Sequence, residues 1–132
     1  MLPPQNRLRR SLDHRSTVRR GIRVSRGLLV IHFLAPHTAA ANEPVRAGFV
    51  VGRAVGTAVV RNAVRRRLRH LLRDRLNRLP GGSRVVVRAG PAAATATSTA
   101  LARELDDALD AAVAAWRRTR QPGSRPTVGA VP

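Results

Sequence analysis

The chain has 132 residues and a formal net charge of +18, and all 25 of its basic residues are arginine. The length predicts one domain, and the charge indicates a protein that binds a polyanion such as nucleic acid. The absence of cysteine excludes disulfides, thiolate nucleophiles and zinc–thiolate sites. No apolar run approaches the ~20 residues that span a bilayer, and no secretory signal begins the chain, so we expect a cytoplasmic protein without a membrane partner.

The first third of the chain predicts an arm, a helix and two strands. Residues 1–10 hold two prolines and three arginines, which favours a flexible basic arm. Residues 11–20 can form a short helix that stops at Gly21. The apolar runs of residues 27–34 and 45–51 are typical of strands, and turn residues between them predict a loop.

The stretch from Ala58 to Leu79 is the most informative part of the sequence. At about 100° per residue, a helix here places five arginines and one asparagine within one arc, namely Arg61, Asn62, Arg65, Arg66, Arg69 and Arg73. Apolar residues at helical spacing occupy the opposite side. Asp74 is the only acidic residue among eight arginines in residues 61–78. Salt bridges within the stretch cannot neutralise this face, so we interpret it, with His70, as a surface that contacts phosphates or bases.

The last third predicts one more strand and one more helix. Residues 84–88 are strongly β-prone, and residues 98–118 show a helical apolar stripe that ends near Trp116. Four of the seven acidic residues lie in this helix, so we expect it to face away from nucleic acid, with its aspartates as solvated charges. Residues 120–132 are rich in proline and glycine and are expected to form a disordered tail. Residues 11–119 would then be a single RNA-binding domain, a small α+β sandwich.

No cluster of side chains indicates catalysis by the polypeptide. The four histidines are scattered, and none has the spacing of a metal-ligand pair. No glycine-rich phosphate loop of the required pattern follows a strand. We therefore assign no catalytic residue and no metal ligand to this chain.

Residues 61–69, Arg-Asn-Ala-Val-Arg-Arg-Arg-Leu-Arg, resemble the signature helix of the protein subunit of bacterial ribonuclease P. The segments of residues 46–53 and 84–88 resemble the family strands on either side of that helix. Near the start of the chain, residues 7–9 and 11–14 with Gly21 resemble the family's first helix and the turn after it. The matches together span about residues 7–116. Where the family carries Arg-Asn-Arg, this chain has Ala63 in the third position, and Arg67 can partly substitute from the next turn.

The resemblance implies a two-layer sandwich of a four-stranded sheet and three helices, in the order α-β-β-β-α-β-α, with a left-handed βαβ crossover. It implies a monomeric subunit that binds a catalytic RNA and the 5′ leader of precursor tRNA and assists removal of the leader. Mg²⁺ would be held by the RNA and the substrate rather than by a protein cage. Arg53 would join the basic face in RNA binding, and the leader cleft would be lined by His14, Val18 and His32.

Two other functions stay open from the residues alone. A structural RNA-binding protein of the ribosomal type suits the composition equally well. A DNA-binding protein could place the basic helix in a major groove, although no leucine heptad or helix-turn-helix pairing accompanies it. Co-purification of a structured RNA, of ribosomal subunits or of duplex DNA would separate the three.

Overall fold

The computed structural model describes residues 2–35 and 42–120. The tail expected for residues 120–132 therefore lies, apart from Arg120, outside the described residues. The main elements follow the expected order: α1 (Ser11–Arg20), β1 (Ile22–Ser25), β2 (Leu29–Leu34), β3 (Arg46–Val51), α2 (Ala58–Arg73), β4 (Arg84–Ala89) and α3 (Ser98–Arg120). Among the described residues, no helix is both long enough and apolar enough to cross a membrane.

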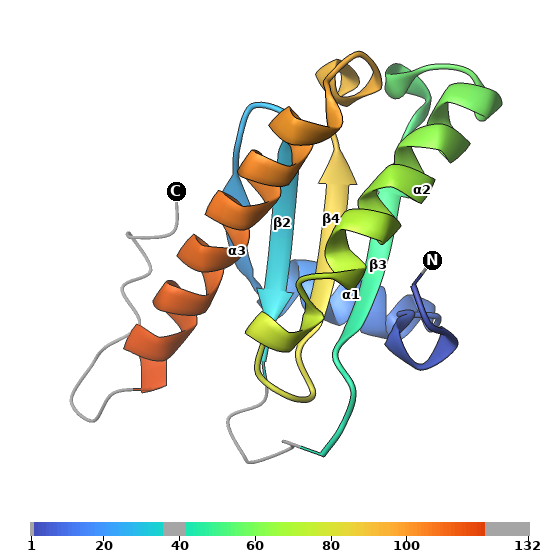
Figure 1. The fold of residues 1–132 in the computed structure, drawn as a ribbon. Helices are drawn as coiled ribbons and strands as arrows, with labels where there is room; N and C mark the ends of the chain where they lie inside the picture. Colours follow the sequence, from blue (N-terminus) through green and yellow to red (C-terminus); the bar gives the residue numbers. More distant parts are fainter. Residues whose placement is uncertain (1, 36–41, 121–132) are drawn as a thin grey trace.

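The four strands form one mixed sheet in the order β1-β2-β4-β3. The pairs β1–β2 and β2–β4 are antiparallel, whereas β3 and β4 are parallel. In Figure 1, β3 and β4 both run upward, α2 joins them in front of the sheet, and β4 lies to the left of β3. The β3-α2-β4 connection is therefore the expected left-handed crossover, a hand that is rare among such units.

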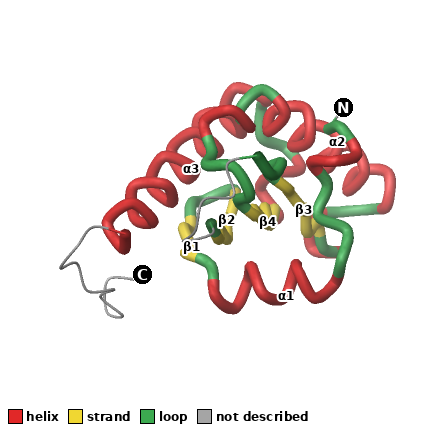
Figure 2. The backbone as a smooth tube through the Cα atoms, turned by 90° about the horizontal axis from the view of Figure 1, so that it is seen from below, coloured by secondary structure: helices red, strands yellow, loops and turns green. Residues whose placement is uncertain are grey.

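Helices cover both faces of the sheet, α2 and α3 on one and α1 on the other (Figure 2). Because side chains alternate along a strand, Val85 and Val87 enter the core under α2 and α3, whereas Val86 faces α1. The sequence predicts two layers, and the structure adds α1 as a third. Thr17, which is fully buried, anchors α1 against the sheet.

β1 is the strand that hydrophobic periodicity does not locate. Within it only Val24 is buried, and Arg23 is exposed. A four-residue edge strand with one buried side chain gives little apolar signal. β1 pairs with β2, with Ile22 opposite Phe33, and so completes the four-stranded sheet that the resemblance implies.

Residues 2–10 contact the outer edge of β3. Leu2 and Leu8 are buried. The Leu8 amide donates to the Ala47 carbonyl at 2.8 Å, and the Asn6 side-chain amide donates to the Val45 carbonyl at 2.8 Å. The structure thus differs from the flexible arm expected for residues 1–10, because two leucines and the unpaired edge of β3 provide a docking surface for it.

α2 begins at a well-defined cap and ends before Leu79. The Thr57 hydroxyl accepts a hydrogen bond from the Val60 amide at 3.3 Å. Gly56 has a φ of 154°, a conformation that side chains disfavour, and a Cβ there would also press on Val60. The buried side of α2 consists of Val64, Leu68 and Leu72. After Arg73 the chain turns through a 3₁₀ segment, so the helix is shorter than the periodic stretch suggests.

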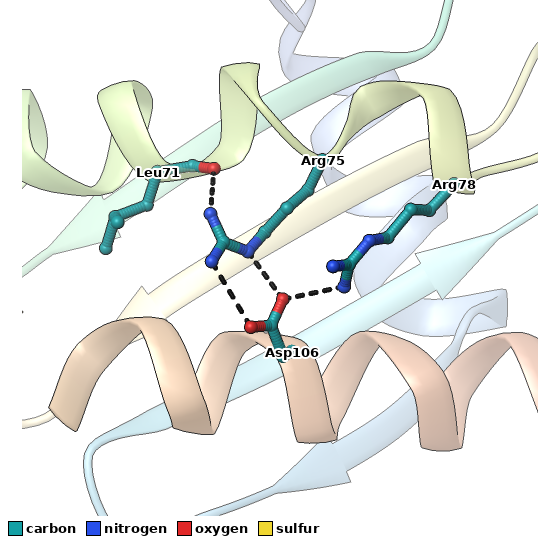
Figure 3. A network of polar contacts seen from close by, with 4 residues as sticks. All are labelled: Leu71, Arg75, Arg78 and Asp106. Atoms are coloured by element: carbon teal, nitrogen blue, oxygen red, sulfur yellow. Dashed lines mark hydrogen bonds and ion pairs between the residues drawn. The ribbon is translucent and has the colours of Figure 1, made fainter. Parts of the chain in front are cut away.

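One carboxylate on α3 fixes the segment that follows α2 (Figure 3). Arg75 contacts Asp106 with Nε at 2.5 Å and Nη2 at 3.2 Å, and it also donates to the Leu71 carbonyl at 2.7 Å. Arg78 donates to the same carboxylate at 2.8 Å. Hydrogen bonds from Arg75, followed by the positive charges of Arg75 and Arg78, hold the pKa of Asp106 below its usual value.

Other acidic residues of α3 also contact the rest of the fold. Asp107 pairs with Arg26 at 2.5 Å, and Glu104 accepts a hydrogen bond from the Leu28 amide at 2.8 Å. The expectation that the aspartates of this helix are solvated charges is therefore wrong for Asp106, whereas Asp107 is exposed but also paired. Their partners lie on segments distant in sequence, which periodicity within the helix cannot reveal.

Asp106→Asn is expected to lower the free energy of unfolding by about 1–2 kcal/mol at pH 7, because two guanidinium groups lose their shared anion. The folded-state pKa is lowered, so this contribution is present above the usual aspartate pKa of about 4 and is lost as the pH falls further. Urea unfolding at pH 7 and pH 3 measures both effects. Asp110→Asn, at an exposed position on the same helix, is the control, and equal losses in the two variants would contradict the assignment.

Candidate nucleic-acid interface

The exposed side of α2 borders a hollow of about 640 Å³, which we call the α2 hollow, lined by Asn62, Arg65, Arg66, Arg69 and His70. These residues recur at intervals of three and four, so successive turns of one helix bring them to one surface. All five belong to the face that the sequence predicts. The structure brings them together around a single recess.

The three arginines of the α2 hollow have no carboxylate partner within the described residues. Arg65 donates to Asn62 Oδ1 at 3.0 Å and to the Val51 carbonyl at 3.5 Å. The guanidinium carbon of Arg69 lies 6.0 Å from the centroid of the Phe49 ring. These contacts orient the cations but leave their charge uncompensated, which favours binding of a polyanion.

The arginines at and after the end of α2 have carboxylate partners. Arg73 lies 3.5 Å from Asp74, and Arg75 and Arg78 share Asp106. The prediction considers only carboxylates within the stretch, and α3 supplies a further one from outside it to Arg75 and Arg78. Free positive charge is concentrated in the earlier turns of α2.

Arg61 and Arg53 lie outside the α2 hollow. Arg61 is in the first turn of α2, and its Nε is buried without a hydrogen-bond partner among the described residues. Such a donor costs about 1–3 kcal/mol unless a bound group accepts from it. Arg53 is exposed in the 3₁₀ turn between β3 and α2.

A second hollow, of about 320 Å³, lies at the edge of β3, and we call it the β3 hollow. It is lined by Arg7, Leu8, Arg9, His14, Ala47, Gly48, Phe49 and Arg69. Arg69 therefore borders both hollows. Of these residues, only His14 and Arg69 are site residues predicted from the sequence. A glycine in the middle of strand 46–51 is the signal that could have revealed the rest, since it often marks a close approach.

The three residues expected in a leader cleft share the face of the sheet that α1 covers. His14 lies against Gly48 of β3, and Val18 is one turn further along α1 and partly buried. His32 on β2 is 6% exposed. Val86 of β4 pairs with both His32 and Gly48, so about 10 Å of sheet separates the backbones of those two residues.

Burial, together with the positive charges of Arg88 and Arg23, lowers the pKa of His32. Arg23 lies directly opposite His32 on β1. The Nδ1 atom of His32 is buried and has no hydrogen-bond partner among the described residues. His32 is therefore neutral near pH 7, so it contributes an imidazole surface rather than positive charge.

The described residues do not form a metal cage. Across residues 2–35 and 42–120, no group of three histidine, aspartate or glutamate side chains could hold a metal ion.

Comparison with known proteins identifies relatives over most of the chain. The family model described as Ribonuclease P matches residues 2–113. The Ribonuclease P protein component of Streptomyces griseus is 55% identical over 114 residues, which cover 83% of this chain and 93% of the relative. The corresponding protein of Salinispora tropica is 49% identical and covers 95% of this chain and 100% of the relative.

Solved structures share the fold at lower sequence identity. The RNase P protein of Staphylococcus aureus superposes with a TM-score of 0.70 at 20% identity, over 81% of this chain and 94% of that one. The RNase P protein of Thermotoga maritima gives a TM-score of 0.64 at 23% identity, over 76% and 92% of the two chains. Both likenesses support the α+β architecture.

Arg65→Ala, Arg66→Ala and Arg69→Ala are each expected to weaken RNA binding and to reduce the log–log salt slope by about one unit, because each removes one phosphate contact. Filter binding over a salt series measures the slope. Arg103→Ala removes an exposed arginine from α3 and is the matched control. A triple variant that keeps the wild-type slope and affinity would exclude the α2 hollow as an RNA contact.

The free energy of unfolding is expected to decrease as the pH falls below about 6.5, because the unfolded chain binds a proton that buried His32 resists. One such group contributes at most about 1.4 kcal/mol per pH unit. His32→Gln should flatten this dependence between pH 6.5 and 5, whereas His70→Gln, at an exposed position, should not. If the free energy of unfolding changed with pH in the same way for the wild type and His32→Gln, the effect of His32 burial would be refuted.

Proposed function

The chain belongs to the ribonuclease P protein family, and on this basis we propose that it is the protein subunit of a ribonucleoprotein that removes the 5′ leader from precursor tRNA. The observation that carries this proposal is the α2 hollow, where three arginines have no carboxylate partner among the described residues. A folded RNA supplies the closely spaced phosphates that such a surface requires.

The catalytic RNA is the proposed partner of α2. Arg65, Arg66 and Arg69 would each contact phosphate, and their planar guanidinium groups can donate two hydrogen bonds to one phosphate. We propose Arg61 as an additional contact at the start of the helix. We propose Arg53, Asn62 and Arg73 as further contacts, with Arg73 the weakest because Asp74 already lies beside it.

The face of the sheet beside α1 is the proposed site for the single-stranded leader. His14 and His32 would offer imidazole surfaces, and Val18 would offer an apolar contact without a π face. Arg88, which is exposed on this face, adds a cation near His32. Aromatic stacking contributes about 1–3 kcal/mol per base, so a site with two imidazoles and a valine should give a modest preference for precursor over mature tRNA.

The hydrolytic chemistry is proposed to reside in the RNA. Mg²⁺ bound by the RNA and the substrate would supply an activated water, and the polypeptide would bind and orient the two RNAs. We propose one protein copy, monomeric within the complex, acting in the cytoplasm where tRNA precursors are made. The chain's membership of the ribonuclease P family favours this function over the ribosomal and DNA-binding alternatives.

The purified chain without RNA is expected not to cleave precursor tRNA. Addition of the organism's ribonuclease P RNA and Mg²⁺ should give cleavage at the mature 5′ end, because the proposed catalyst is the RNA. Gel analysis of end-labelled precursor measures the product. The Arg65/Arg66/Arg69 triple alanine variant should require more protein for the same rate, and Arg103→Ala should not. Specific cleavage by rigorously RNA-free protein would overturn the proposed division of labour.

A further inference from the structure

We propose that Gly48 is a positioning residue for leader recognition, because the space left by its missing side chain seats the ring of His14. This inference rests on the proposed function of the α1 face. It assigns a role to a buried strand residue that acts through the His14 ring. It also explains why a glycine stands in the interior of β3, where it is otherwise unfavourable.

A side chain at position 48 would displace the ring of His14. A Cβ atom built there would overlap Nε2 and Cε1 of His14 and would lie 3.3 Å from Cδ2. The imidazole thus occupies the volume that a side chain at position 48 would fill. The strand backbone forms the floor of this seat, and the ring lies directly on it.

The backbone at Gly48 gives no independent reason for glycine. Among the described glycines, positive φ angles occur only at Gly56 and Gly82. Gly48 pairs in regular parallel register with Val86. Alanine would therefore suit the strand conformation, and it would restrict the unfolded chain more than glycine does. The contact that alanine disturbs is the one with His14.

Contacts around His14 hold α1 in place, so the orientation of the His14 ring depends on its contact with Gly48. Asp13 pairs with Arg84 of β4 at 3.3 Å, and the Thr17 hydroxyl donates to the Asp13 carbonyl at 2.7 Å. Thr17 is fully buried. The hydrogen bond lies within α1, whereas the ion pair of Asp13 with β4 and the burial of Thr17 hold α1 on the sheet on both sides of His14.

The seated ring borders the β3 hollow, where Phe49 and Arg69 also lie. One imidazole, one aromatic ring and nearby guanidinium groups suit a single-stranded nucleotide, whose base stacks and whose phosphate pairs with a cation. Arg69 also borders the α2 hollow. The seat at Gly48 therefore holds His14 at the junction between the proposed leader site and the proposed contact with the catalytic RNA.

A thermal-denaturation cycle tests the seat without any RNA. Gly48→Ala should lower the melting temperature of the wild-type chain. In the His14→Ala background the space is free, so the same substitution should leave the melting temperature unchanged or raise it. Gly52→Ala, where a Cβ would meet nothing within 4 Å, is the matched control. Equal destabilisation in both backgrounds would overturn the inference.

A binding cycle tests the role in recognition. With the reconstituted complex, the ratio of precursor to mature tRNA affinity should fall in Gly48→Ala to the value of His14→Ala, and the double variant should show no further loss. Affinity for mature tRNA should stay constant, which a general folding defect would not allow. Gly52→Ala should retain the wild-type ratio.

The two cycles separate failure of the seat from failure of the proposed function. A wild-type complex with no preference for precursor would refute leader recognition, even if the thermal cycle behaved as expected. If Gly48→Ala kept the wild-type preference for precursor tRNA while His14→Ala lost it, the positioning role of Gly48 would be refuted, but leader recognition would not. If Gly48→Ala fails to fold, the His14→Ala/Gly48→Ala double variant should still fold. If the double variant also fails to fold, the inference that Gly48 makes room for His14 is overturned.

Discussion

Repulsion between like charges along α2 is the constraint on which the arrangement of this protein depends. Three arginines border one recess without a carboxylate among the described residues, and their mutual repulsion opposes the compact helix. The buried side of α2, with Val64, Leu68 and Leu72, offsets that cost by apolar contact. Asp106 of α3 pairs with the next two arginines along the chain, Arg75 and Arg78. The fold thereby leaves the arginines of the α2 hollow as a cluster without a carboxylate, where an anionic partner would remove the repulsion.

The left-handed β3-α2-β4 connection places this surface beside a second one. It leaves β3 at the edge of the sheet, with α2 over one face and α1 across the other. Residues from both helices can therefore meet around a single strand. Arg69 reaches that strand from α2, and His14 reaches it from α1. A connection of the opposite hand would not give this arrangement with the same order of strands.

Helical periodicity predicted that the residues of the α2 hollow share a face, because Asn62 to His70 lie within three turns of one helix, where spacing alone decides which side chains share a face. The pairing of Arg75 with Asp106 escaped prediction because 31 positions separate the two residues. The docking of residues 2–10 escaped it for a similar reason, since Leu8 finds its partner at Ala47. The role of Gly48 becomes visible only when α1 is packed on the sheet. Local patterns thus predicted the elements, and tertiary contacts determined how charge and space are shared between them.

The segment that docks on β3 also protects it. An edge strand exposes a row of peptide groups that can pair with any other extended chain. Here the Leu8 amide already uses the Ala47 carbonyl, and Leu2 and Leu8 cover apolar atoms beside it. Proteolytic loss of the first ten residues would uncover this edge next to a highly cationic surface. RNA could then gather several truncated chains and bring their bare strands together, which would turn a binding protein into a nucleus for aggregation.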